Sequence, residues 1–299
     1  GRRLATVLAA ALGATLLGAA APPAAQADAG TAPRPIMSGW IPYWSTSAGV
    51  DAVLDNSDLF GDVSPFWYSA QWSNSASRIA QQVSSASKTY LLDSLRPTGV
   101  EILPAITDGM GKGRMAAVMK DATLRTAFVN QLVALAVNNG YDGVDLDFEG
   151  FAFADGSSTW STTRPAWVAF VKQLSAALHA KGKQLAVTTP PLYDTDYDGS
   201  SGYWVYDWKA IAPYVDRLRI MTYDYSVSGG NIAPFWWVEK VLAFAVTQVP
   251  ASKIQLGVAA YGRNAVKSIS GTCPTNVPSN YRNVLSFTAA NALTAIPSA

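Results

Sequence analysis

The chain has 299 residues, 49% of them apolar, which is enough to bury the core of one barrel-sized domain of about 250 residues. Its 22 basic and 21 acidic residues nearly cancel, and they form no Lys/Arg stripe, so nothing favours a nucleic-acid-binding protein. A chain of this size needs no disulfides to fold, and its single cysteine, Cys273, is either an inert thiol or has a partner beyond residue 299.

The N-terminus has the layout of a secretory signal peptide over residues 1–27. A basic pair, Arg2 and Arg3, precedes the apolar run Leu4–Ala20, and Ala25–Ala27 forms a small-residue cleavage site. The alternative is a membrane anchor, but the run is rich in Ala and Gly and is followed by a proline pair and the cleavage site. We expect a secreted protein that has no membrane contact once the peptide is removed.

A linker of small residues and prolines follows over residues 28–36, and we expect a single catalytic domain over residues 37–299. Short apolar runs then alternate with longer helical stretches, which is typical of repeated β-α units around a parallel sheet. The expected strands are Met37–Tyr43, Val63–Tyr68, Val100–Ile106, Gly143–Glu149, Gln184–Thr189, Leu218–Tyr223 and Ile254–Ala259. No second domain, repeat or low-complexity tract is visible.

Three helices can be read between these strands from their apolar periodicity. One contains Leu124 to Leu135 and ends near Gly140, a second begins near Pro165 and ends before Gly182, and a third spans about residues 234–249. The only histidine, His179, falls in the last turn of the second helix. We expect it on the surface there, which argues against a Ser-His-Asp site.

The pattern predicts an α/β fold, a (β/α)8 TIM barrel. A complete barrel of this type needs eight strands, and seven are visible. The residues after Ala259 are rich in Ser, Asn, Thr and Ala, with no further strand and helix. We therefore expect a barrel that is incomplete at its C-terminus, before the eighth strand.

The clearest chemical signal is the run Tyr141–Gly150, YDGVDLDFEG. Alternate side chains of a strand share a face, so Asp145, Asp147 and Glu149 point one way and the apolar residues between them the other. In a barrel the carboxylates would point into the interior, where poor solvation should raise the pKa of at least one of them. Glu149 comes last, at the carboxyl end where barrel active sites lie, so it is best placed to act as a general acid.

The acidic run is also compatible with two alternatives to a catalytic site. The first is an ordinary polar barrel interior, which would not require three acids in strict alternation. The second is a Mg²⁺ or Ca²⁺ site of oxygen ligands, which is possible in principle, but we expect neither a metal nor a cofactor.

The acidic run resembles the D-x-x-D-x-D-x-E signature of glycoside hydrolase family 18, the chitinase family, with Asp142, Asp145, Asp147 and Glu149 at its acidic positions. Met221–Tyr225 and Gly257–Arg263 resemble the family's strand-six and strand-seven motifs. The resemblance covers about residues 37–263.

Two further segments resemble a bacterial branch of the family with spore-cortex and peptidoglycan-lytic members. They are Gly39–Trp44 in the first strand, and Pro234 with Trp237–Lys240 in the third helix. Two features depart from the family pattern. Ala105–Gly109 stands where many chitinases carry Ser-x-Gly-Gly, and the closing strand with its tryptophan is not visible.

The resemblance implies retaining, substrate-assisted hydrolysis, in which the substrate's own N-acetyl group acts as nucleophile. Glu149 would then be the catalytic acid and base. Asp147 would hold the acetamido N–H, and Asp145 would share a proton with Asp147. Tyr223 would align the acetamido oxygen and Asp224 would support the sugar, while Asp142 would have a structural role.

Such chemistry requires 2-acetamido sugars, so we expect β-1,4-linked N-acetylglucosamine polymers as partners of a monomeric enzyme: chitin, its oligomers, peptidoglycan glycan or, in an endo-acting enzyme, N-glycans. Aromatic residues at or just after strand ends are candidates for stacking on these sugars, although core packing is an equal alternative for each of them. The candidates are Tyr43, Trp67, Tyr68, Trp236 and Tyr261. A lectin-like protein without turnover is the alternative function, but such relatives usually lose the acid that is retained here as Glu149.

Overall fold

The computed structural model describes residues 37–227, 230–263 and 278–280. The expected signal peptide, the linker and Cys273 lie outside these residues. No helix in the described part of the chain is long and apolar enough to cross a membrane.

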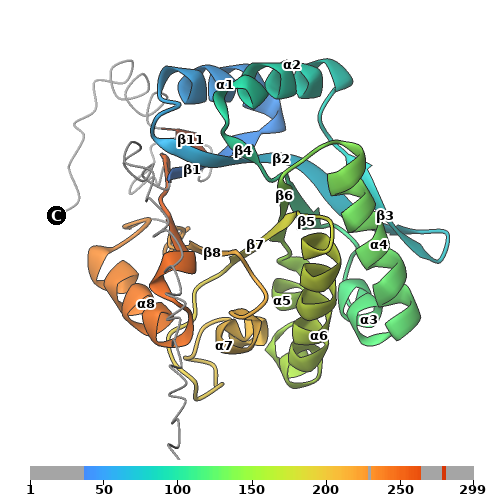
Figure 1. Cartoon of the computed structure of the whole chain (residues 1–299). Coiled ribbons are helices and arrows are strands. Elements are labelled where there is room, and N and C mark those ends of the chain that lie inside the picture. Colours follow the sequence, from blue (N-terminus) through green and yellow to red (C-terminus); the bar gives the residue numbers. More distant parts are fainter. Residues whose placement is uncertain (1–36, 228–229, 264–277, 281–299) are drawn as a thin grey trace, which may run out of the picture. The chain divides into compact units, whose positions relative to one another are not determined.

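The core of the fold is a sheet of parallel strands in the order β1-β2-β5-β6-β7-β8-β9. The strands span Met37–Pro42, Phe60–Ser73, Ala105–Asp108, Gly143–Asp147, Gln184–Thr189, Arg217–Met221 and Ile254–Gly257. All seven expected strands are confirmed, and each pairs with the next in parallel register. Within the described residues no further parallel strand joins β9 to β1, so the curved sheet stays open between these two edges (Figure 1).

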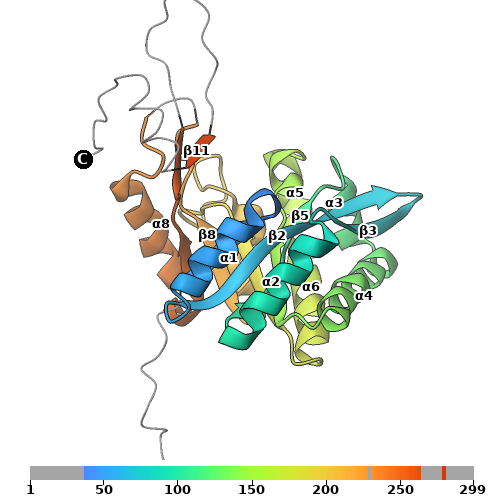
Figure 2. The ribbon, with the colours of Figure 1, turned by 90° about the horizontal axis from the view of Figure 1, so that it is seen from above.

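Two strands differ from their expected form. The second extends to Ser73 and turns back into the antiparallel strand β3 (Ala76–Gln81), which forms a hairpin projecting from the sheet (Figure 2). Asn74 and Ser75 have φ of 51° and 60° at its tip, the left-handed pair that a tight two-residue hairpin turn requires. The third expected strand divides into β4 (Glu101–Ile102) and β5, since Pro104 between them has no N–H for a ladder.

Helices lie around the outer side of the sheet (Figure 1). They are α1 (Thr46–Asp55), α2 (Ser85–Leu95), α3 (Arg114–Lys120), α4 (Ala122–Asn138), α5 (Gly150–Phe153), α6 (Trp160–His179), α7 (Trp208–Ile211) and α8 (Phe235–Gln248). The three expected helices are α4, α6 and α8. Helix α6 begins five residues before Pro165, because Trp160 is buried and its indole N–H donates to the carbonyl of Ala152 at 3.1 Å.

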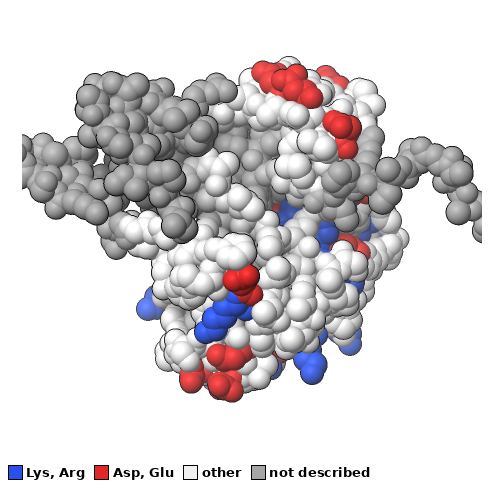
Figure 3. Space-filling view, turned by 90° about the vertical axis from the view of Figure 1, so that its left-hand side faces the viewer, with Lys and Arg blue, Asp and Glu red and all other residues white. Residues whose placement is uncertain are grey.

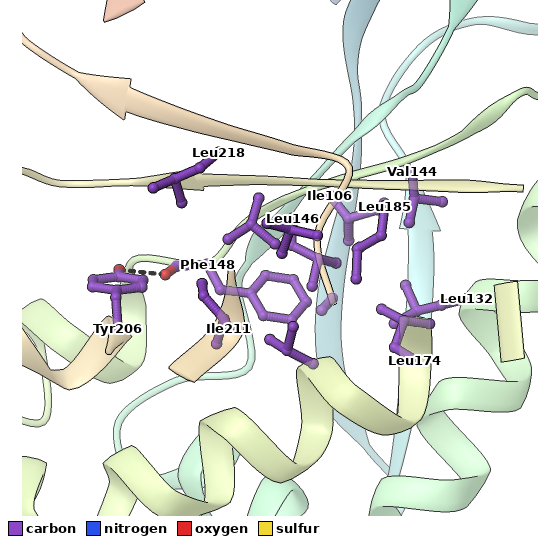
Figure 4. Packing of buried hydrophobic residues seen from close by; sticks show 14 of the residues in the cluster. Ile106, Leu132, Val144, Leu146, Phe148, Leu174, Leu185, Tyr206, Ile211 and Leu218 are labelled. Atoms are coloured by element: carbon purple, nitrogen blue, oxygen red, sulfur yellow. Dashed lines mark hydrogen bonds between the residues drawn. The ribbon is translucent and has the colours of Figure 1, made fainter. Parts of the chain in front are cut away.

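The main apolar core fills the layer between the sheet and these helices. Phe148, just after β6, stacks with Phe128 of α4 and Phe170 of α6 at ring distances of 6.1 Å each. Val144 and Leu146 point into the same layer, toward Leu132 and Leu174 (Figure 4). The apolar set of β6 therefore packs under the helices, as its alternation predicts, and its carboxylates are left to the barrel interior.

A short antiparallel pair, β10 (Tyr261–Arg263) with β11 (Pro278–Asn280), follows β9 and stands apart from the barrel sheet. On the face drawn in Figure 3, basic and acidic side chains are interspersed across a mainly uncharged surface. That face has no continuous basic stripe, in agreement with the balanced charge of the chain.

Candidate active site

The site begins with Asp145 and Asp147 on the interior face of β6. Both side chains are buried, Asp145 completely and Asp147 with 8% of its surface exposed. Glu149 lies two residues beyond Asp147, where the strand gives way to α5, and it is half-buried. The three carboxyl groups thus run from the middle of the interior to the carboxyl end of the strand.

Asp145 is held by four donors. Its Oδ2 accepts from the hydroxyl of Ser64 at 2.7 Å, the indole N–H of Trp40 at 3.3 Å and the guanidinium of Arg219 at 2.6 Å. Its Oδ1 accepts from the hydroxyl of Thr188 at 2.9 Å. Donors from four other strands, β1, β2, β7 and β8, therefore fix this carboxylate and compensate its charge.

Arg219 is the main functional candidate that the sequence analysis missed. It is 1% exposed and also forms an ion pair with Asp62, which is fully buried. Burial lowers the pKa of Arg219, but Asp145 and Asp62 more than offset this effect and raise it. One signal was available in the sequence: Arg217 and Arg219 occupy alternate positions of a strand, so both side chains point to the interior. Their partners lie elsewhere in the sequence.

Asp147 has a different environment. No hydrogen-bond partner reaches its buried Oδ1 among the described residues. Burial, then the charges of Glu149 and Asp145, raise its pKa well above the usual carboxyl range. Such a group resists ionisation, so it retains a proton at a pH at which a solvated aspartate has lost it.

Glu149 has the pKa shift that a general acid requires. Burial, and next the negative charge of Asp224, raise its pKa above the ordinary value. A raised pKa keeps a carboxyl group protonated closer to neutral pH, so that it can donate its proton to a leaving group.

Tyr223 and Asp224 come two and three residues after the end of β8, close enough to Asp147 and Glu149 to affect, and be affected by, their charges. Burial, then Asp147, raise the pKa of Tyr223, so its hydroxyl is a donor at all physiological pH values. Its ring packs edge-on against Tyr261 at 6.0 Å. Gly257 of β9 makes room for it, since a Cβ there would lie 2.8 Å from the Tyr223 ring. Asp224 adopts a left-handed backbone with φ of 59°.

A cavity of about 1210 Å³ opens onto this site between the β1 and β9 edges. Its lining includes Trp40, Phe66, Asp147, Arg219, Tyr223 and Tyr261. Aromatic walls around a few polar groups are typical of small-molecule and sugar sites. Tyr261 thus lines the same cavity as Asp147 and Tyr223.

Two of the expected sugar-stacking residues are wrong. Trp67 is fully buried and Tyr68 is 3% exposed, so neither can face a substrate. The Tyr68 hydroxyl instead pairs with that of Tyr141 at 2.8 Å, and Lys88 donates to it at 3.0 Å. The cause is the length of β2, which continues to Ser73, so both residues lie within the strand and not at its carboxyl end.

Tyr43, another aromatic candidate, follows the carboxyl end of β1. It is 40% exposed, and its ring contacts that of Trp44 at 4.8 Å. Trp44 is more exposed than Tyr43 and lines the cavity. At this strand end Trp44, and not Tyr43, is the residue that lines the cavity.

Asp142 and His179 are not among the residues that line the cavity. Asp142 accepts a 2.8 Å hydrogen bond from the backbone N–H of Ile102, which ties β6 to β4. His179 is the last residue of α6, is exposed as expected, and pairs with Asp216 at 2.8 Å. In the part of the chain that the structure describes, no cluster of His, Cys, Asp or Glu could hold a metal ion.

Two curated bacterial proteins are similar to this chain. The chain is 30% identical over 188 residues to the putative sporulation-specific glycosylase YdhD of Bacillus subtilis (strain 168), covering 62% of this chain and 42% of that protein. It is 30% identical over 150 residues to the cortical fragment-lytic enzyme of Bacillus anthracis, covering 49% of this chain and 33% of that protein. The chain thus spans less than half the length of these curated relatives.

Among solved structures, the C-terminal domain of a putative chitinase from Desulfitobacterium hafniense DCB-2 has the same fold, with a TM-score of 0.73 and 23% identity over 89% of this chain and 79% of that one. The family pattern of Glycosyl hydrolases family 18 matches residues 65–292, which include all the carboxylates of β6 described above. The chain belongs to glycosyl hydrolases family 18.

Proposed function

We propose that the protein is a retaining glycosidase that hydrolyses β-1,4-linked N-acetylglucosamine polymers by substrate-assisted catalysis. The observation that carries this proposal is the succession of two carboxyl groups at the carboxyl end of β6. Asp147 lines an aromatic-walled cavity and has a buried oxygen without a partner among the described residues, and Glu149, two residues further on, has a raised pKa. Substrate assistance removes the need for a second enzyme carboxylate as nucleophile. A neighbouring acetamide is a nucleophile already in place, which lowers the entropic part of the barrier.

In this proposal Glu149 protonates the glycosidic oxygen as the acetamido carbonyl oxygen attacks the anomeric carbon. The C–O bond to the leaving group breaks and an oxazolinium ion forms. Glu149, now a carboxylate, takes a proton from the water that opens this ion, so the anomeric configuration is retained.

Asp147 accepts the acetamido N–H in the same proposal. Its Oδ1 has no partner among the described residues, so the substrate would satisfy an acceptor that is costly to leave buried. The Tyr223 hydroxyl donates to the acetamido oxygen and Asp224 contacts the sugar. These two residues follow β8 at the carboxyl end of the sheet, as Glu149 does after β6.

Asp145 has a modified role in our proposal. Both of its oxygens already accept hydrogen bonds, and Arg219 forms an ion pair with it at 2.6 Å. Asp145 therefore acts on Asp147 through its negative charge, which favours the protonated form of Asp147. The protonated carboxyl group keeps one oxygen as an acceptor for the acetamido N–H, so no proton has to leave Asp147 when the substrate binds.

We favour peptidoglycan glycan or short N-acetylglucosamine oligomers as the substrate. The first-strand segment Gly39–Trp44 resembles the cortex-lytic branch, and a relative at 30% identity is named a cortical fragment-lytic enzyme. The N-terminal pattern of residues 1–27 supports export, and we propose that the protein acts outside the cell as a monomer.

The test compares wild type and Glu149→Gln on fluorogenic chito-oligosaccharides and on purified peptidoglycan. General acid catalysis typically contributes about 10²–10⁴-fold, so turnover should fall by at least that factor while sugar binding remains. Glu239→Gln is the matched control, because this glutamate is exposed on α8. Equal activity of wild type and Glu149→Gln would refute the assignment of Glu149, and sugar binding without turnover in both would indicate a lectin-like protein.

A further inference from the structure

The catalytic glutamate is also the N-cap residue of helix α5, and its side chain does not cap that helix. Side chains at this position usually accept a hydrogen bond from the second or third N–H of their own helix, because those N–H groups have no partner within it. A capping Glu149 would turn its carboxyl group back onto the backbone. That carboxyl group would then be unable to donate to a substrate.

Asp108, and not Glu149, accepts the hydrogen bond from the backbone at the start of α5. This residue is the last of β5, the strand beside β6. Its Oδ2 accepts from the N–H of Phe151, the second residue of α5, at 2.9 Å. Its Oδ1 accepts from the N–H of Met110 at 3.2 Å. One carboxylate therefore joins the loop after β5 to the segment that carries Glu149.

Gly150 permits this contact. A Cβ at this position would lie 2.7 Å from Oδ2 of Asp108 and 3.3 Å from its backbone oxygen. Real Cβ atoms essentially never make contacts shorter than 3 Å, so any larger residue would displace either the carboxylate or α5. In the order Glu149-Gly150-Phe151, the acid is therefore followed by a residue without a side chain and then by the residue whose N–H is capped.

We propose that Asp108 is a positioning residue that caps α5 from the neighbouring strand and so keeps the Glu149 carboxyl group directed at the substrate. This inference rests on the proposed function, since it assigns Asp108 a role in the reaction of Glu149. It also accounts for the departure from Ser-x-Gly-Gly at Ala105–Gly109: the aspartate belongs to a different supporting network.

Three features around Asp108 bear on its protonation. Burial raises its pKa to about 6, the two backbone N–H groups oppose this shift, and the charge of Asp155 adds to it. Asp155 follows α5 and accepts from the N–H of Gly113, and the fully buried Tyr206 also faces this region. Because the folded pKa is raised, Asp108 loses its negative charge as the pH falls through about 6, and the cap weakens below that pH.

The test uses three variants of the full chain. Asp108→Ala removes the cap, and kcat should fall by about 10²-fold with little change in KM, because a displaced catalytic group costs about that much. Asp108→Asn keeps an oxygen acceptor, so kcat should recover most of this loss. The Asn variant should also lose the decrease in activity near pH 6 that titration of Asp108 causes in wild type.

Asp121→Ala is the matched control. Asp121 caps α4 through the N–H groups of Thr123 and Leu124, both at 2.8 Å, on an exposed part of the surface. Its loss should lower the thermal unfolding midpoint about as much as Asp108→Ala. It should leave kcat and the pH profile unchanged, because it does not contact the Glu149 segment.

Amide hydrogen exchange at Phe151 gives a readout that does not depend on activity. Faster exchange in Asp108→Ala together with the loss of kcat supports the proposal. Unchanged exchange overturns the cap, and faster exchange at wild-type kcat overturns its role in positioning. If wild type fails to hydrolyse any N-acetylglucosamine polymer, the proposed function is refuted independently of the cap. Amide exchange at Phe151 then still tests whether Asp108 caps α5.

Discussion

Asp145 and Asp147 lie two residues apart on one face of one strand, yet their surroundings differ sharply. Asp145 accepts four hydrogen bonds, one of them from a buried arginine. Asp147 has a buried oxygen with no partner among the described residues, and its pKa is raised well above the usual range. The interior stabilises the negative charge of Asp145 and disfavours that of Asp147. A carboxyl group whose pKa is perturbed in this way is typical of a functional site.

The difference extends along the barrel axis. Toward the amino ends of the strands, Arg217 pairs with both Asp62 and Glu101, and Arg219 pairs with Asp62 and Asp145. At the carboxyl ends, no ion pair among the described residues includes Asp147 or Glu149. The charges at one end of the interior are therefore paired, while the carboxyl groups at the other end have raised pKa values.

The largest expected effect comes from Arg219→Met, which breaks the paired end. The variant leaves the carboxylates of Asp62 and Asp145 buried without their common cation. Removing one partner of a buried ion pair typically costs about 3–5 kcal/mol, so the free energy of unfolding should fall by that amount. Urea denaturation of wild type and variant at pH 7 measures this loss.

A matched substitution, Arg164→Met, separates the effect of burial from the effect of removing a charge. Arg164 pairs with Asp207 at 2.6 Å, but 28% of its side chain is exposed. Partly exposed pairs contribute about 1 kcal/mol or less, so this variant should lose little stability. Equal losses in the two variants would mean that water reaches Asp62 and Asp145, and that the barrel interior is not the low-dielectric environment described here.

The sequence predicted the strands and the acidic interior face of β6 because both depend on local alternation. Seven apolar runs gave seven parallel strands, and the spacing of Asp145, Asp147 and Glu149 placed these acids at the interior and at the end of β6. Burial of alternate residues is enforced by the packing of Phe148 and its neighbours under the helices, so a one-residue slip would expose the core.

Other features depend on contacts that no local pattern contains. Arg219 meets Asp62 across 157 residues of sequence, and only the curvature of the sheet brings the two together. Trp67 and Tyr68 were misplaced because β2 continues to Ser73, where it pairs with β3, so residues expected at a strand end lie inside the strand. Asp108 was visible as an odd residue in a family motif, but its bond to Phe151 requires the register of β5 with β6.

A smaller effect is expected from Gly257→Ala. The new methyl group would lie 2.8 Å from the Tyr223 ring and 2.9 Å from the carbonyl oxygen of Ile220, so the ring must move. Overpacking of this kind costs about 1–3 kcal/mol, and displacement of Tyr223 should lower kcat/KM on chito-oligosaccharides. Thermal unfolding and steady-state kinetics measure the two effects.

Gly61→Ala is the control for that variant. Gly61 also lies in a strand, β2, but the nearest atom to an added Cβ is the carbonyl oxygen of Met37 at 3.9 Å. Its substitution should leave both stability and kcat/KM nearly unchanged. If Gly257→Ala also left stability and kcat/KM unchanged, the reaction would not depend on the position of the Tyr223 hydroxyl that Gly257 allows.

The smallest expected effect, and the one that tests the contrast between the two aspartates most directly, is a gain in stability from Asp147→Asn. The folded pKa of Asp147 is raised, so its protonated form is favoured by folding. Its contribution to stability is greatest below the unfolded pKa of about 4 and is lost as the pH rises above that value. Asparagine is never ionised, so the variant should be about 1–2 kcal/mol more stable than wild type at pH 8 and less so at pH 4, while turnover falls.

The same change two residues earlier should have the opposite sign. Asp145→Asn removes the charge that pairs with Arg219 at 2.6 Å, so it should destabilise the protein at pH 8. Urea unfolding of both variants at pH 4 and pH 8 gives the four differences needed. A gain for Asp147→Asn beside a loss for Asp145→Asn means that the fold stabilises one ionised carboxylate and is destabilised by the other, whereas losses in both would mean that Asp147 has a stabilising partner in solution and its proton is not held by burial.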